Sequence, residues 1–315
     1  TVISLERAVA IGRLWAYAAP AAAGLSGFCL LVGAPLGVVQ ALAIIAAGVM
    51  VGASLQVLRR LTAPFTIVLA LGAACWLVGN LAWLASGMLT PAVPWWLAFL
   101  VLTIAGERLE LTRFLPTPPA AQRLFIAIVG TILTGAALSL WFADGGLRLF
   151  AGGLLALAGW LLRYDIARRN ARQQGLTRFI AVCLLSGYFW LALAGALGVA
   201  GALLPGDIWR DAALHAIGLG FVFAMVFGHA PIIFPAVARV KIPYHPVFYV
   251  PLLVLHASLA LRVGGGLTGD FAGQRAGGAA NALALLLFIA TMLISVVRGK
   301  RQTHSSGKAA NDETP

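Results

Sequence analysis

The residues best suited to chemistry in this sequence are histidines, and four of the five lie in the single stretch from Asp211 to Val263. These four are His215, His229, His245 and His256. Neutral imidazole is the commonest protein ligand for metals, and histidine also holds haem iron as an axial ligand. Their apolar surroundings matter, because polar side chains inside a bilayer are costly and tend to be functional. The cluster therefore predicts haem b and/or copper bound by these four residues.

The spacing of the histidines predicts two pairs at two depths. His215 and His229 are fourteen residues apart, which in an α-helix puts them within about 40° of one face and about 21 Å apart. His245 and His256 are eleven residues apart, within about 20° of one face and about 16 Å apart. Because the second helix runs back, the expected pairs are His215 with His256 and His229 with His245.

Two alternatives stay open for this cluster. Helices in direct contact lie about 8–10 Å apart, too close for a flat haem between them, so either the helices flank a cleft or a small ion such as copper is bound. The same histidines could also be hydrogen-bonding residues without a cofactor. Prolines crowd the connection between the two helices and predict a broken or re-entrant backbone there; they are Pro231, Pro235, Pro243, Pro246 and Pro251.

The elements that must position these histidines are membrane-spanning helices. The chain of 315 residues is 61% hydrophobic, well above the roughly 45–50% of a soluble domain. Runs long enough to cross a bilayer as helices are expected near 14–33, 37–57, 63–86, 92–106, 122–142, 146–163, 178–204, 212–237, 246–264 and 278–297. We therefore predict an all-α, polytopic membrane protein of about ten transmembrane helices, with a single transmembrane domain over 1–298 and a disordered cytoplasmic tail over 299–315.

The net charge of +12 does not indicate a nucleic-acid partner, because the basic residues form short clusters between apolar runs. With ten spans, 18 of the 22 lysines and arginines fall on one side of the membrane, and the remainder are Arg148, Arg210, Arg262 and Arg275. The excess of positive charge on the cytoplasmic side predicts that both termini are cytoplasmic, in an inner-membrane-type protein embedded in a lipid bilayer. The sequence does not indicate the oligomeric state.

Other chemistry is less well supported by the sequence. Glu107 and Glu110 stand beside Arg108 and Arg113, where interfacial ion pairs are expected rather than a proton path. Three cysteines without paired spacing predict no disulfide and no thiolate metal site. No P-loop, GxGxxG, GxSxG or HExxH motif occurs, which argues against a hydrolytic or nucleotide-driven enzyme. Whether the protein is an enzyme at all stays open.

The segment LHAIGLGFVFAMVFGHAPI, which contains His215, Met225 and His229, resembles the NnrS family of bacterial membrane proteins linked to denitrification and nitric-oxide stress. The resemblance implies bound haem and copper and a role in relieving nitrosative stress, with His215 as the best match to the family's helix-borne histidine. The downstream GHAPIIFPAV differs from the basic, His-Thr-Gly-Arg-like ending of the family, and the chain has fewer spans.

Two functions of other classes remain as alternatives. Ten helices with both termini inside also fit a metabolite or drug transporter built from two inverted five-helix repeats, although the two halves show no convincing similarity. A non-catalytic membrane assembly subunit is the third possibility, and it requires the four histidines to be incidental.

Overall fold

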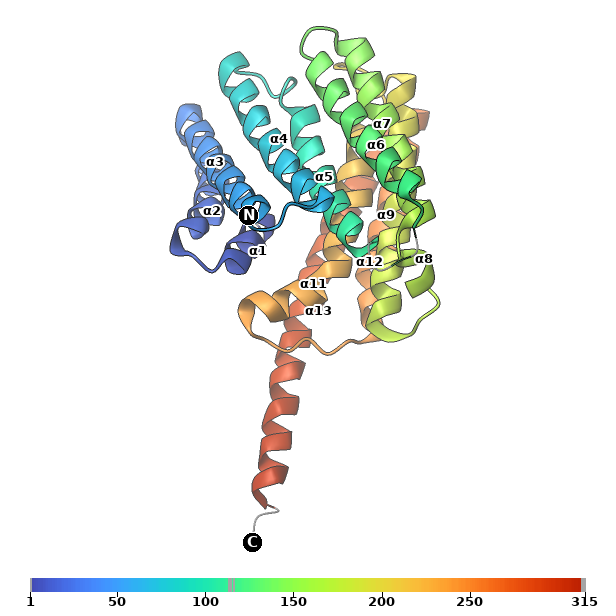
Figure 1. Ribbon diagram of the computed structural model, residues 1–315. Coiled ribbons are helices and arrows are strands. Elements are labelled where there is room, and N and C mark those ends of the chain that lie inside the picture. The colour runs from blue at the N-terminus through green and yellow to red at the C-terminus, as the bar shows by residue number, and fades with distance from the viewer. Residues whose placement is uncertain (1, 113–114, 116, 313–315) are drawn as a thin grey trace. The chain divides into compact units, whose positions relative to one another are not determined.

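The computed structural model describes residues 2–112, 115 and 117–312, and the side chains of residues 3–112, 115 and 117–299. Every regular element in this part of the chain is helical (Figure 1). Helices satisfy their backbone hydrogen bonds internally, which is what lipid demands of a chain this apolar. The prediction of an all-α, polytopic membrane protein is therefore confirmed.

The chain divides into two compact units, each described here by itself. Unit 1 comprises residues 1–165 and 195–207. Its helices are α1 (Val2–Ile11), η1 (Leu14–Tyr17), α2 (Ala18–Leu31), α3 (Leu36–Arg60), α4 (Pro64–Ser86), α5 (Val93–Thr112), α6 (Pro119–Leu138) and α7 (Ala143–Tyr164). Sequential helices pack as neighbours, with α4 against α5 and α6 against α7.

Unit 2 comprises residues 166–194 and 208–315 and contains the four histidines of interest. Its elements are α8 (Ala167–Asn170), most of α9 (Gly175–Ala200), α10 (Arg210–His215), the π-helical segment η2 (Ala216–Phe223), α11 (Ala224–Ala238), η3 (Pro246–Phe248), α12 (Tyr249–Thr268) and α13 (Phe271–Asp312). Within this unit, α12 packs against α13. A core centred on Phe179, Phe227, Phe248 and Phe288 joins α9, α11, α12 and α13.

Nine helical segments of the described chain are long and apolar enough to cross a membrane, and they match nine of the ten predicted spans. The remaining prediction, 92–106, corresponds to α5. This helix falls short because every 18-residue stretch of it includes Glu107, Arg108 and Glu110. Its apolar residues are instead enclosed by unit 1, where Val101, Leu102 and Ala105 are fully buried.

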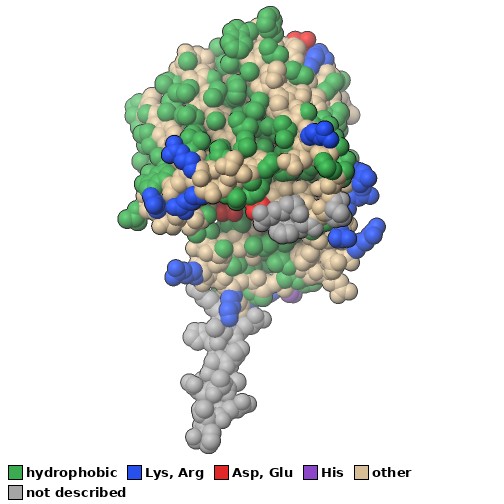
Figure 2. Space-filling model, viewed as in Figure 1, with side chains coloured by type: hydrophobic (Ala, Val, Ile, Leu, Met, Phe, Trp, Pro, Cys, Tyr) green, Lys and Arg blue, Asp and Glu red, His purple; other side chains and the backbone are tan. Residues whose placement is uncertain are grey.

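The outer surface of the helices is apolar, as a bilayer requires. Large hydrophobic side chains are exposed along the spans, among them Leu31, Leu286 and Leu293 at 87%, 63% and 62%. Figure 2 shows a face dominated by hydrophobic side chains, with lysine and arginine confined to small groups. All three cysteines are free, as expected.

The expected single transmembrane domain over 1–298 stays a prediction, because the two compact units are groups of contacting residues. The units do not correspond to two five-helix halves, because α2 to α7 all belong to unit 1, so the inverted-repeat transporter gains no support. The backbone of α13 continues as helix through Gly299 to Asp312, where a disordered tail was expected; this stretch contains no proline to end the helix. Order in solution stays untested there, and residues 313–315 lie outside the described residues.

Candidate functional site

The element that carries His215 and His229 is a single helical rod, Arg210–Ala238, whose middle is π-helical over Ala216–Phe223. Pro231 and Pro235 lie inside α11 without ending it. The rod ends at Arg239, which has a left-handed backbone with φ of 53°, and a non-helical connection follows. The backbone break predicted around His229 and His245 begins after Ala238, so it includes His245 but not His229, and a further irregularity lies at the π segment.

His215 is half-buried at the end of α10 and is bonded to its own helix. Its Nδ1 lies 2.8 Å from the Asp211 carbonyl oxygen and 3.2 Å from the Asp211 carboxylate. Both of these oxygens only accept, so Nδ1 carries the proton and donates. The lone pair of the neutral ring is then on Nε2.

Asp211 also ties this end of the rod to two other helices. Its carboxylate accepts from Arg262 of α12 in a bidentate pair, Nη2–Oδ1 at 2.8 Å and Nε–Oδ2 at 3.0 Å. Gln274 of α13 donates to the same carboxylate at 3.0 Å. We call these residues, with His215, the Asp211 network. Fork-to-fork bonding of this kind is geometrically specific, so the network fixes the orientation of His215.

His229 repeats the local geometry of His215, fourteen residues farther along the same span. Its Nδ1 lies 2.7 Å from the carbonyl oxygen of Met225, four residues earlier, and again the proton must be on Nδ1. The helix here is pressed against α9: Met225 meets Gly187, and Gly228 faces Cys183. These contacts hold the turn that presents His229.

The π segment changes the angle between the two histidines. A π-helix bonds residue i to i+5 and so takes up one residue more per bonded turn than an α-helix. One extra residue turns the following helix by about 100° and widens the expected separation from about 40° to about 140°. The shared face expected from an uninterrupted α-helix therefore does not apply. The contacts agree, since the partner of His215 reaches α12 and α13 while the turn of His229 packs on α9.

His256 of α12 bonds to residues of α9, and no sequence motif indicated this contact. Trp190 donates from Nε1 to His256 Nδ1 at 2.9 Å, and the rings are stacked with centroids 6.3 Å apart. An indole N–H can only donate, so His256 is protonated at Nε2 and donates to the Ser186 hydroxyl at 2.9 Å. Both ring nitrogens thus have protein partners. A side chain at Gly220 of η2 would overlap Trp190, so glycine at this position allows η2 to pack against Trp190 of α9.

His245 is exposed in the connection before η3, and its Nδ1 accepts from the backbone N–H of Val247 at 3.1 Å. This is an ordinary local cap. Among the described residues, no three of the His, Cys, Asp and Glu side chains come together as a metal-binding group. The bonds found for His215, His245 and His256 run to residues other than histidine, so the two predicted pairs stay predictions.

A carboxyl group of unit 1 has a perturbed environment that the sequence indicated only in part. Burial, together with the like charges of Glu6 of α1 and Glu110, raises the pKa of Glu107 to about 7, against the opposing charges of Arg108 and Arg7. The proximity of Glu6 was not expected, because it lies about a hundred residues away in sequence. Arg113, which was expected beside Glu107 and Glu110, lies outside the described residues.

The chain belongs to a family described as a domain of unknown function (DUF8744), whose model matches residues 1–297. A search of the curated proteins and a search of the solved structures each found no match.

Proposed function

We propose that this DUF8744 protein binds haem and/or copper in the membrane through His215 and His229 of the rod Arg210–Ala238. The observation that carries the proposal is the geometry that the two histidines share. Each donates from Nδ1 to the carbonyl oxygen four residues earlier, at 2.8 Å for His215 and 2.7 Å for His229.

This geometry is typical of metal-bound imidazole. A histidine that ligates a metal almost always donates its other N–H to a carbonyl or carboxylate, which fixes the tautomer and the orientation of the ring. His215 has both kinds of partner in Asp211. In each residue the remaining nitrogen, Nε2, is the basic one, as coordination requires.

Haem and copper would require different numbers of protein ligands, and the proposal keeps both. Copper sites draw several ligands from the protein. Haem iron needs only one or two axial ligands from the protein. If haem is bound, His215 or His229 would hold the iron, and the haem would supply a coordination position for a small diatomic ligand.

The remaining two histidines serve as controls. His256 would have to break its bond with Trp190 or with Ser186 to ligate a metal, and His245 is exposed and engaged with Val247. We assign them structural roles, in place of the paired sites expected from spacing.

The test is the spectrum and metal content of the purified full chain, expressed in cells supplied with haem and copper. We expect a Soret band, or stoichiometric metal, that is reduced in His215→Ala and His229→Ala and kept in His245→Ala and His256→Gln. Absence of both haem and copper in a folded wild-type protein would overturn the proposal and favour the assembly-subunit alternative. Selective loss in His256→Gln would overturn the assignment of ligands.

The biological setting follows from the resemblance to NnrS alone. We propose a role in the response to nitric oxide and denitrification stress, in a bacterial inner membrane with both termini in the cytoplasm. A deletion strain should grow poorly under nitric-oxide stress and recover with the wild-type gene but not with His215→Ala. Normal growth under that stress, with a defect in moving one metabolite, would instead support a transporter.

A further inference from the structure

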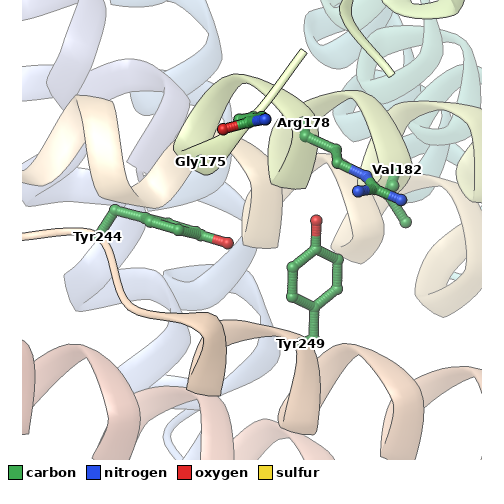
Figure 3. A pocket seen from close by; sticks show the side chains of 6 residues that line it. Gly175, Arg178, Val182, Tyr244 and Tyr249 are labelled. Atoms are coloured by element: carbon green, nitrogen blue, oxygen red, sulfur yellow. The ribbon is translucent and has the colours of Figure 1, made fainter. Parts of the chain in front are cut away.

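A pocket of about 370 Å³ lies in unit 2 where α9 and α12 begin. Its lining combines one guanidinium, two phenols and an amide with a small apolar wall: Gln174, Gly175, Arg178, Val182, Tyr244 and Tyr249. Figure 3 shows the hydroxyls of Tyr244 and Tyr249 pointing toward the same space, with the Arg178 side chain reaching in from α9. The pocket is separate from the histidines of the proposed metal site.

The tyrosine rings are held in place by a buried aromatic cluster. Phe179 and Phe248, each 1% exposed, pack edge to face with centroids 5.6 Å apart. Tyr249 packs on Phe179 at 5.2 Å, and Tyr244 packs on Phe248 at 5.8 Å. Because the rings are fixed, the two hydroxyls are preorganised and a ligand would not have to order them.

The polar groups of the pocket are suited to an anion. The Tyr249 hydroxyl interacts with Tyr244 and lies near the charge of Arg178. Phenols and guanidinium groups donate hydrogen bonds, and Arg matches phosphate and carboxylate oxygens in geometry. Gln174 adds an amide that can also donate.

The charged side chains of unit 2 around the pocket are basic, so an anion that binds there would come from outside the chain. In unit 2, the only carboxylates with described side chains are Asp211 and Asp270, and both lie near the opposite ends of these helices, where α10 and α13 begin. The pocket end carries further basic side chains, which are Arg168, Arg169, Arg172, Arg239 and Lys241. A cavity lined by donors and positive charge, with no carboxylate among its lining residues, attracts a negatively charged ligand.

We propose that this pocket binds the phosphate of an anionic phospholipid headgroup. The pocket lies at the ends of two membrane-spanning helices, on the side where the distribution of arginine predicts the cytoplasm. Apolar side chains continue from it along α12, with Val250 48% exposed and Leu253 65% exposed, and Leu253 is one turn beyond Tyr249. Acyl chains can lie on this face while the headgroup occupies the pocket, and basic pockets at this depth suit anionic lipids.

The test measures thermal unfolding of the full chain in a neutral detergent with three probes: phosphatidylglycerol, phosphatidylcholine and inorganic phosphate. We expect phosphatidylglycerol to raise the midpoint in a saturable manner, and the other two to raise it little. Arg178→Gln and Tyr249→Phe should each weaken the apparent affinity by about ten-fold, the effect of losing one hydrogen bond to a charged group. Arg172→Gln is the matched control, since Arg172 is exposed nearby but does not line the pocket.

Three results would overturn the inference. Equal stabilisation by phosphatidylglycerol and phosphatidylcholine would mean that the anionic headgroup is not recognised. Equal stabilisation by inorganic phosphate would identify a soluble anion as the ligand. An equal effect of Arg178→Gln and Arg172→Gln would mean that only the general positive charge matters. None of these outcomes depends on whether a metal is bound at His215 or His229.

Discussion

The two ends of unit 2 treat an arginine in opposite ways. At one end Arg262 is locked to a carboxylate in the Asp211 network, which joins α10, α12 and α13. At the other end Arg178 lines an open pocket with two tyrosines and no described carboxylate of the unit beside it. At one end the arginine is neutralised within the chain, and its ion pair holds three helices together. At the other end the arginine lines a pocket, where we propose that a lipid phosphate neutralises it.

The largest effect on the free energy of unfolding should follow from breaking the ion pair between Asp211 and Arg262. Asp211→Asn leaves Arg262, only 22% exposed, without its counter-charge, and we expect a loss of about 2 kcal/mol of unfolding free energy, between exposed and buried ion pairs. The matched control is Asp144→Asn, because Asp144 pairs with Arg148 at the same 2.8 Å but is 65% exposed. Its cost should be about 0.5 kcal/mol or less. Equal losses in thermal or denaturant unfolding would contradict the distinction.

Between the two ends of unit 2, His256 links α12 to α9 through hydrogen bonds with Trp190 and Ser186. Ser186→Ala removes the acceptor of the His256 Nε2 proton and should cost about 1 kcal/mol, the usual cost of a buried donor left without a partner. Thr291→Val is the control, because the Thr291 hydroxyl only donates to a carbonyl of its own helix. If both substitutions have the same effect on the unfolding midpoint, His256 is not held by this bond.

Glu107 of unit 1 differs from Asp211, because the effect of burial on its pKa is larger than the opposing effect of the neighbouring arginines. The pKa of Glu107 is raised from 4.5 to about 7, so the folded state binds its proton more tightly than the unfolded state. Stability from this group is present below about pH 4.5 and is lost as the pH rises toward 7. Glu107→Gln should flatten the pH dependence of the unfolding midpoint over this window. A wild-type slope kept in the variant would assign the titration to another group.

The smallest effect on the free energy of unfolding is expected at the pocket end of unit 2. In a neutral detergent without anionic lipid, Arg178→Gln should change the unfolding free energy by no more than about 0.5 kcal/mol, as for most surface substitutions. Arg178 is exposed and has no described carboxylate partner in its unit. A loss as large as that of Asp211→Asn would show that Arg178 stabilises the fold as Arg262 does, and it would contradict the difference between the two ends.

The spans could be predicted from sequence because lipid imposes a length and an apolar composition on each helix. Nine of the ten agree with helices that could cross a membrane. The segment at α5 was recognised as a helix, but the environment of its charged end was not predicted, because Glu107 lies near the charges of Glu6 and Arg7, which are distant in sequence. Hydropathy carries no information about such tertiary partners.

The candidate site was predictable in its residues but not in its geometry. The histidines could be found by type and spacing, yet the angular calculation assumed an uninterrupted α-helix, and Ala216–Phe223 is π-helical. Local sequence gives little warning of a π segment. The partners of His256 were also missed, since Ser186 and Trp190 lie on another helix about seventy residues earlier and form no motif with it.

The enclosure of α5 has a consequence for how the protein is made. A segment ending in Glu107, Arg108 and Glu110 is a weak signal for entry into the bilayer during synthesis, because charged residues raise the cost of insertion. Its earlier neighbour α4 carries Asn80, which accepts a hydrogen bond from Trp96 of α5 at 3.1 Å, and the rings of Trp76 and Phe99 stack between the same helices. The two helices can therefore insert into the bilayer as a preformed hairpin, in which the hydrophobicity of α4 drives the insertion of both.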